Sequence, residues 1–253
     1  MESISFACVL SIKKMSDSAK ILSLIKNSRQ RTKKSIEGGF EYHHLAIVKS
    51  RKFLRKHDSE RLPFFVMFVD LVGSTKMSSK LDPQIFNTVI RCFSQEMAYV
   101  IEQFDGYALK YIGDAVLAYF FADKNSNRIA NNVVECAKAM NQVIEKAINP
   151  VLKEEGITNI QVKVSVDFGK CSVVRYGSDK RRSHIDLIGL TLNVAAKMQS
   201  IAKPRQILIG KNVFTKLNPK LKTLFKKAKT NPKEWKYPEL GHTSAYSVYT
   251  NFD

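Results

Sequence analysis

Asp70 is the first residue in this sequence whose position suggests chemistry. It ends an apolar run, Phe64–Val69, that predicts a buried strand, and Gly73, Ser74 and Thr75 follow almost at once. A carboxylate at a strand tip beside small residues and a turn can hold a metal ion against a phosphate. The alternative is that Asp70 caps an ordinary turn between a strand and a helix. The stretch alone favours neither reading.

A second carboxylate, Asp114, lies at the tip of a predicted hairpin. Tyr107–Ile112 and Ala115–Phe120 have the pattern of two strands joined tightly through Gly113 and Asp114. If the strand leading into this turn lies beside the strand that ends at Asp70, both carboxylates reach the same edge of the sheet. Two carboxylates there suit Mg²⁺, a hard cation that prefers oxygen ligands. The competing reading is that Asp114 only fills a tight turn.

The elements that must position these carboxylates alternate along the chain. Apolar residues recur at three- and four-residue intervals after Asp82 and Pro83 and again over 128–152, which predicts two long helices. Further strands are expected at 160–168, 171–176, 183–187, 206–209 and 245–250, with helices near 191–201 and 211–217. Because several neighbouring strands form hairpins, we predict an α+β fold. Its antiparallel-rich sheet would have a βαββαβ core, ferredoxin-like or palm-like, with flanking helices.

Composition limits the possible functions. The chain has 253 residues and a net charge of +18, carried mostly by residues 1–60 and 201–253. These basic flanks are not interleaved with aromatic residues, so we interpret them as a solvated surface and expect no nucleic-acid partner. Cysteines stand at four scattered positions, Cys8, Cys92, Cys136 and Cys171. This spacing predicts free thiols in a cytoplasmic protein, and no apolar run is long enough for a transmembrane segment.

Two regions divide the chain. Residues 61–253 hold the periodic elements and both carboxylates, and we interpret them as one domain. Residues 1–60 form a basic N-terminal extension with possible helices over 16–34 and 45–56 and a possible strand or short helix at 4–12. The adjacent His43 and His44 have no further ligands nearby, so a metal site there is not expected. Three roles are open for the extension, a dimerisation element, a regulatory arm or a segment that packs onto the main domain, and no chemistry is assigned to it.

Three short motifs in a fixed order make the chain resemble a known family. They are Phe68–Thr75, Lys110–Asp114 and Asp186–Met198, and together they are similar to the catalytic domain of class III nucleotidyl cyclases. The resemblance covers about residues 62–250. It implies an adenylate cyclase that converts ATP to 3′,5′-cyclic AMP and pyrophosphate at the interface of a homodimer.

The resemblance also implies roles for particular residues at the metal and phosphate end of the site. Asp70, Leu71 and Asp114 would belong to the site for two Mg²⁺ or Mn²⁺ ions. The turn over 71–75, with Gly73, Ser74 and Thr75, would hold the β- and γ-phosphates through its backbone amides, which agrees with the affinity of glycine-containing turns for anions.

The base and the ribose would be contacted by residues from the opposite protomer. Lys110 and Asp186 match the family's purine-selecting pair. Lysine can donate to N1 of adenine and aspartate can accept from its exocyclic amine, which points to ATP. Asn193 matches the asparagine that orients the ribose or the reacting phosphate. Lys197 stands where most active members carry an arginine that stabilises charge in the transition state, and it lacks the planar bidentate fork of arginine.

Two departures from the family pattern leave alternatives open. Lys197 replaces the usual arginine. Leu240 precedes Gly241, where many members of the family have a lysine that binds phosphate, and Lys236 is the candidate to take that role. The alternatives are a cyclase for another nucleotide, GTP or a pyrimidine, and a catalytically weak cyclase-like sensor that binds nucleotide. An unidentified regulator is also possible. Asp70 is the best candidate to accept the proton of the 3′-hydroxyl, unless the metal acidifies that hydroxyl enough for water to suffice.

Overall fold

A computed structural model describes residues 17–38, 45–177, 179, 183–231, 233, 235–238 and 244–251, with the side chains of 17, 18 and 45 outside the description. The motif candidates at 4–12, His43, His44, Leu240 and Gly241 lie outside these ranges. The helices are α2 (Asp17–Ile36), α3 (Leu45–Lys56), α4 (Ser74–Ser78), α5 (Pro83–Gln103), α6 (Ser126–Val143), the π-helical turn η1 (Ile144–Ile148), α7 (Asn149–Glu154), α8 (Leu190–Met198), α9 (Lys211–Phe214) and α10 (Pro219–Lys222). The strands are β1 (Arg61–Leu71), β2 (Tyr107–Ile112), β3 (Ala115–Phe121), β4 (Val162–Tyr176), β5 (His184–Ile188), β6 (Ile207–Gly210), β7 (Lys226–Lys227) and β8 (Val248–Thr250).

The strands form one sheet in the order β2-β3-β1-β4-β6-β8-β7, and β5 pairs with β4 outside this path. The pairs β2–β3, β3–β1 and β1–β4 are antiparallel, whereas β4 and β6 run parallel. Elements β1 to β4 with the helices between them make the predicted βαββαβ core, so the α+β fold is confirmed. One detail differs from the expectation: β3, the strand after the Gly113–Asp114 turn, lies beside β1, and β2 lies outside it.

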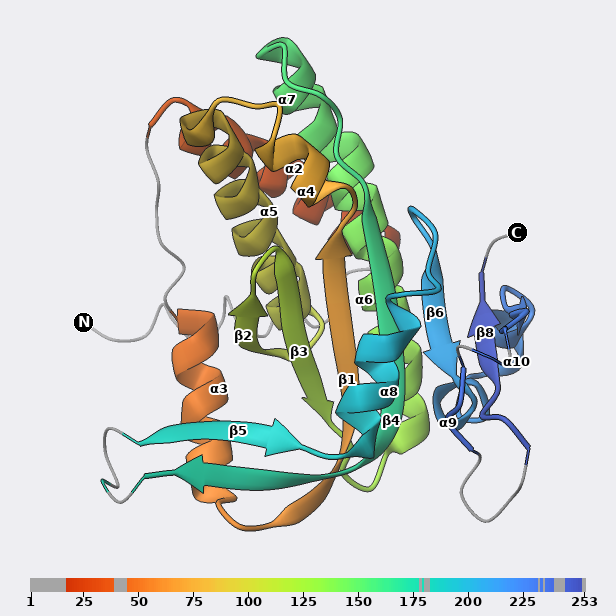
Figure 1. The fold of residues 1–253 in the computed structure, drawn as a ribbon. Helices are drawn as coiled ribbons and strands as arrows, with labels where there is room; N and C mark the ends of the chain where they lie inside the picture. The colour runs from red at the N-terminus through yellow and green to blue at the C-terminus, as the bar shows by residue number, and fades with distance from the viewer. Residues whose placement is uncertain are drawn as a thin grey trace.

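Alternating residues of β1 divide between the two faces of the sheet. Phe65, Met67 and Val69 point into the larger core, which the long helices α5 and α6 cover. Phe64 and Val66 point into a second core on the other face, beneath α8 and α3. In Figure 1 α8 lies over one face of the sheet, and α5 and α6 lie over the opposite face. This period-two burial explains why β1 has a nearly continuous apolar sequence.

The boundaries near Gly169 are the main local difference from the predicted strands. Strands expected at 160–168 and 171–176 are one 15-residue strand, β4, in which Gly169 pairs with Phe64 of β1. A Cβ atom at position 169 would collide with the side chain of Thr191, at the start of α8. Gly169 therefore allows α8 to approach the sheet closely and does not interrupt the strand.

Helix α2, from the basic N-terminal extension, packs against the helices that cover the larger core. Leu24 belongs to that core. Arg31 donates two hydrogen bonds to the carboxylate of Glu96 on α5, at 2.8 and 2.6 Å, and its guanidinium carbon lies 4.0 Å from the centroid of the Tyr99 ring. The Glu96 side chain is only 2% exposed, so this pair is a largely buried, bidentate ion pair. A regulatory or dimerising role for residues 1–60 stays a prediction.

Three of the four cysteines, Cys92, Cys136 and Cys171, are free and buried. Burial raises the pKa of each thiol, for Cys171 to about 11 and for Cys92 to about 12. Among the described residues, no helix is long and apolar enough to span a membrane.

Asp167 is a buried carboxyl group on β4, on the same face of the sheet as α8. Its Oδ1 accepts a hydrogen bond from the Tyr246 hydroxyl at 2.6 Å, and that hydroxyl accepts one from the Asn212 backbone N–H at 3.0 Å. Burial raises the pKa of Asp167 from 3.8 to about 7, although the hydrogen bond from Tyr246 opposes the shift. In the folded protein the protonated form is therefore favoured below about pH 7.

Arg31→Ala should destabilise the protein by about 3 kcal/mol, because it leaves the buried Glu96 carboxylate without its partner. Chemical denaturation of the full chain measures this free energy. The matched control is Arg29→Ala on the same helix, whose ion pair with Glu154 is half exposed and should contribute less than about 1 kcal/mol. Equal effects of the two substitutions would show that α2 does not dock through Arg31.

Asp167→Asn should stabilise the protein at pH 8, and the gain should shrink as the pH falls to 5. Between about pH 4 and pH 7 the folded protein holds a proton that the unfolded chain has lost, so the stability of the native sequence falls as pH rises through this window. Asparagine keeps the acceptor for Tyr246 and removes the titration. Urea denaturation at several pH values tests this, and a constant difference between the two proteins across the window would contradict it.

Candidate active site

Pairing of β1 with β3 brings the two predicted metal ligands to one edge of the sheet. Asp70, near the end of β1, lies opposite Ala115, the first residue of β3, and Asp114 immediately precedes Ala115 in the hairpin turn. Gly113 adopts a left-handed conformation, with φ of 58°, which lets the turn be this tight. Figure 1 shows the end of β1 and the β2–β3 turn on the same side of the molecule, with α4 above β1.

The chain turns sharply directly after β1. Gly73 has φ of 74° and ψ of 21°, a left-handed conformation that favours glycine, and it caps the short helix α4, which begins at Ser74. Gly73 and Thr75 are exposed and Ser74 is partly exposed, so their backbone amides are accessible from solvent. The Leu71 side chain is 2% exposed and lies in the core, which leaves only its backbone carbonyl as a possible metal ligand.

Lys163 is a site residue that the sequence reasoning missed. It lies directly opposite Asp70 on β4, and its Nζ is 3.0 Å from Asp70 Oδ2. A signal was present in the sequence, because Lys163, Ser165 and Asp167 alternate with valines on the strand predicted at 160–168. The structure buries Ser165 and Asp167, so this polar side of β4 lies beneath α8 and does not face solvent.

The side chains at this edge fit a hard divalent cation that is shared with a phosphate. Asp70 is in reach of solvent, with 23% of its side chain exposed, and Asp114 is partly exposed. Within the described ranges, no three His, Cys, Asp or Glu side chains cluster closely enough to enclose a metal ion. Mg²⁺ commonly uses one or two carboxylates and completes its shell with water and substrate phosphates, so two aspartates are a sufficient protein contribution.

Lys110 and Asp186 are 76 positions apart in the sequence and form an ion pair in the structure. Lys110 lies on β2 and Asp186 on β5. The Leu187 backbone N–H donates to Asp186 Oδ1 at 2.9 Å, while Lys110 contacts Oδ2. His184 Nε2 is 3.7 Å from the same Oδ2. The aspartate is thus fixed by its own backbone, and the lysine is held beside it as a donor next to an acceptor.

Asn193 and Lys197 project from the exposed side of α8. They are four positions apart, which places them on one helical face, and both side chains are exposed. The other face of α8 is buried in the second core. Gln199, directly after the helix, fixes its end to the sheet, because its Nε2 donates to the Phe68 carbonyl at 2.9 Å and to the Ser165 hydroxyl at 3.0 Å.

The structure therefore gathers the predicted residues into separate groups. Asp70, Asp114 and the turn after β1 lie at one sheet edge, Lys110 and Asp186 form an ion pair, and α8 presents its polar face away from the sheet. Lys236 is exposed and directly follows the buried Trp235, so its side chain points outward.

The sequence matches a family model over most of this architecture. The model describes the adenylate and guanylate cyclase catalytic domain, and it matches residues 59–248. The matched segment includes every predicted site residue.

Curated relatives differ in the nucleotide that their names specify. The chain is 28% identical over 161 residues to a cytidylate cyclase of Escherichia coli, covering 60% of this chain and 34% of that protein. It is 26% identical to a uridylate cyclase of Rhodovulum, covering 60% and 64% of the two chains, and 30% identical to an adenylate cyclase of Anabaena cylindrica, covering 60% and 30%. This chain thus spans about a third of the length of several of these relatives.

Solved structures share the fold. The adenylyl cyclase CyaB from P. aeruginosa superimposes with a TM-score of 0.64 at 21% identity, covering 77% of this chain and 95% of that one. The guanylyl cyclase Cya2 gives the same TM-score at 19% identity, covering 76% and 93%. With the family model matched over residues 59–248, the chain belongs to the adenylate and guanylate cyclase catalytic domain family, the class III nucleotidyl cyclases.

Proposed function

We propose that the protein is a nucleotidyl cyclase for amino-bearing bases, with ATP as the first candidate substrate and CTP as the second. The reaction would convert the triphosphate to a 3′,5′-cyclic monophosphate and pyrophosphate. The observation that carries the proposal is the Lys110–Asp186 pair, which places one fixed donor beside one fixed acceptor.

The chemistry of the base edges explains this choice. Adenine presents a ring-nitrogen acceptor, N1, beside an exocyclic amine, and cytosine presents the same pattern through N3 and its own amine. Guanine and uracil present a ring N–H beside a carbonyl oxygen, which is the reverse pattern. A lysine and an aspartate can satisfy adenine or cytosine, while guanine or uracil would leave buried polar groups unpaired.

CTP is kept as a candidate because of the relatives. Two cytidylate cyclases, from Escherichia coli and Staphylococcus aureus, match this chain at 28% and 26% identity. The two amino-bearing bases differ in size, since adenine is a purine and cytosine a pyrimidine. The depth of the base pocket would therefore separate ATP from CTP, whereas Lys110 and Asp186 would separate both from GTP and UTP.

We assign the remaining groups to substrate phosphates and the ribose. Asp70 and Asp114 would hold the Mg²⁺ or Mn²⁺ ions, which when bound lower the pKa of a coordinated hydroxyl and neutralise phosphate charge. The backbone amides around Gly73 would cradle the β- and γ-phosphates. Lys163 would release Asp70 and turn its ammonium toward the phosphates. Asp70 is the nearest candidate to accept the proton of the 3′-hydroxyl.

Asn193 and Lys197 would act on a nucleotide that is bound to a second copy of the chain. Their exposed position on the outer face of α8, directed away from their own sheet, supports a homodimer whose sites lie between protomers. Asn193 would orient the ribose or the α-phosphate, and Lys197 would stabilise charge as the α-phosphate is attacked. A cytoplasmic location, as the scattered free cysteines predict, fits such an enzyme.

The full-length protein with Mn²⁺ or Mg²⁺ should turn over ATP or CTP on the order of 100-fold faster than GTP and UTP, because only the amino-bearing bases satisfy both Lys110 and Asp186. Mass spectrometry of the products from each of the four nucleotides measures this. Preference for GTP or UTP would contradict the base assignment. Tight nucleotide binding without product would identify a sensor.

Asp70→Ala and Asp114→Ala should each abolish turnover, because each removes a carboxylate ligand of the metal ions. Asp123→Ala is the matched control, since Asp123 is an exposed carboxylate just beyond the other end of β3. Initial rates of product formation, measured over a metal titration, test the assignment. Activity that survives the substitution of both Asp70 and Asp114 would overturn it.

Lys197→Ala should lower kcat on the order of 100-fold, because it removes a positive charge that acts in the transition state. Lys197→Arg should keep or raise kcat, since arginine adds a bidentate fork to the same charge. Lys203→Ala, an exposed lysine beyond the end of α8, is the control. If Lys197→Ala stayed within twofold of the native rate, Lys197 would have no role in the reaction.

A further inference from the structure

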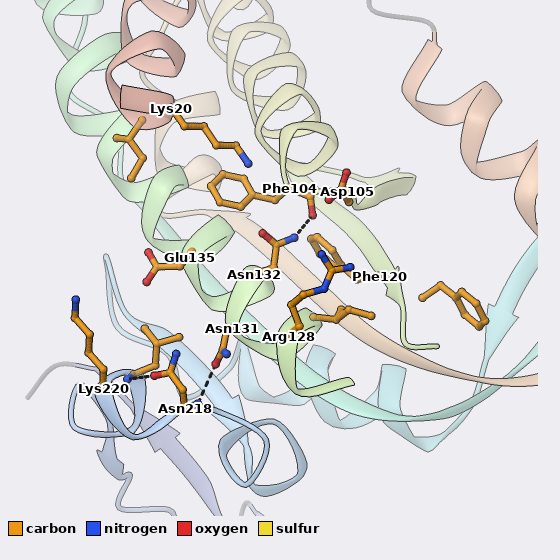
Figure 2. A pocket seen from close by; sticks show the side chains of 14 residues that line it. Lys20, Phe104, Asp105, Phe120, Arg128, Asn131, Asn132, Glu135, Asn218 and Lys220 are labelled. Carbon is orange, nitrogen blue, oxygen red and sulfur yellow. Dashed lines mark hydrogen bonds between the residues drawn. The ribbon is translucent and has the colours of Figure 1, made fainter. Parts of the chain in front are cut away.

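A cavity far from the candidate active site lies where three parts of the chain meet. It has a volume of about 500 Å³ and is bordered by α2, the end of α5, the end of β3, α6 and α10. Lys20, Arg128 and Lys220 line it from three different elements, and in Figure 2 Lys20 and Arg128 lie toward one end of the lining and Lys220 at the other. Its size is that of a pocket for a small molecule.

The cavity is independent of the carboxylate edge. Phe120, which lines it, is five residues along β3 from Ala115, the residue opposite Asp70. At about 3.3 Å per residue, this separates the two places by about 17 Å along the sheet. The cavity also lies on the face that α5 and α6 cover, whereas α8 lies over the other face.

Positive charge exceeds negative charge around the cavity. Lys20, Arg128 and Lys220 face two carboxylates, Asp105 and Glu135, and Glu135 already accepts a hydrogen bond from Lys138 at 2.9 Å. In the part of the chain that the structure describes, Arg128 and Lys220 form no ion pair. Cations from three separate elements, two of them without a counter-charge, favour an anionic ligand.

Three asparagines add hydrogen-bonding groups that are only partly used. Asn132 Nδ2 donates to the Phe104 carbonyl at 2.5 Å, which leaves its Oδ1 as an acceptor. Asn131 Oδ1 and Asn218 Oδ1 accept backbone N–H groups at 2.9 and 2.8 Å, which leaves both Nδ2 groups as donors. Amide donors and acceptors of this kind suit the hydroxyl groups of a sugar and the polar edge of a base.

Apolar side chains complete the cavity. Phe104, Phe120, Ile129 and Leu221 line it, and the Lys20 ammonium lies 4.0 Å from the centroid of the Phe104 ring. A ligand with one charged end and one flat apolar part would use both kinds of surface. Figure 2 shows Arg128 beside Phe120, so a charged and an aromatic side chain lie next to each other in the lining.

We propose that this cavity binds a small phosphate ester of about the size of a nucleoside monophosphate. The phosphate contacts Arg128, and the asparagine amides contact the sugar and the base. Because the ligand touches α2, α6 and α10 at once, it fastens the N-terminal helix to the catalytic domain. The proposal does not depend on cyclase activity, since it uses none of the residues of the candidate active site.

Hydrogen–deuterium exchange of the full chain tests this proposal, with AMP as the probe. The chain carries Asp70→Ala and Asp114→Ala and the buffer contains EDTA, so that AMP does not bind through metal ions at the candidate active site. AMP should slow exchange in the segments 19–24, 126–135 and 218–222. Adenosine, which lacks the phosphate, should give no protection, and inorganic phosphate should give less than AMP. AMP at about 10 mM is ten times a weak Kd of about 1 mM, so a lack of protection at this concentration would overturn the proposal. Equal protection by adenosine or by inorganic phosphate would also overturn it.

Arg128→Ala should weaken AMP binding at least tenfold, measured by the same exchange titration. Arg128 is exposed, so its substitution leaves the core undisturbed. Arg29→Ala is the matched control, because Arg29 is an exposed arginine on α2 that does not line the cavity. Unchanged AMP affinity in the Arg128→Ala variant would contradict the site.

Discussion

The antiparallel pairing of β1 with β3 on one side and with β4 on the other determines where the candidate site residues lie. Its register places Asp70 opposite Ala115 and opposite Lys163. A shift of one residue would turn Asp70 into the core beneath α5 and would bring Val69 to the other face. The two apolar cores fix that register, because Met67 and Val69 pack on one face while Phe64 and Val66 pack on the other. Packing on both faces therefore positions the carboxylates.

The electrostatics of the site follow from this sheet. Lys163 neutralises Asp70 in the free protein, and Lys110 neutralises Asp186. Asp70 and Asp186 thus each have a cationic partner before any nucleotide binds. A bound metal ion and a bound base would take over these partners, so the site exchanges one set of charge contacts for another. Lys197 differs from Lys163 and Lys110, because it is exposed on α8 and faces away from its own sheet.

Much of this arrangement could be predicted from the sequence. Period-two and helical patterns predicted the βαββαβ core, and the turn glycines Gly73 and Gly113 marked both strand ends beside the aspartates. Prediction failed where tertiary contacts override local signals. Gly169 looked like a strand break, but it makes room for Thr191 within a continuous strand. Lys163 was not predicted as a site residue, because nothing local shows that its neighbour across the sheet is Asp70. The choice of β3 over β2 as the partner of β1 also depends on the whole sheet.

In the proposed enzyme a complete site needs two chains, one supplying Asp70 and Asp114 and the other supplying Lys110, Asp186 and α8. The most direct test mixes two inactive variants, Asp70→Ala/Asp114→Ala and Asp186→Ala/Lys197→Ala, and measures cyclic nucleotide formation. Mixed dimers would contain one intact site, so activity should return on mixing and rise with the fraction of mixed dimers. Different tags on the two chains show whether mixed dimers have formed. If they have formed and are as inactive as either variant alone, the two chains do not share a site.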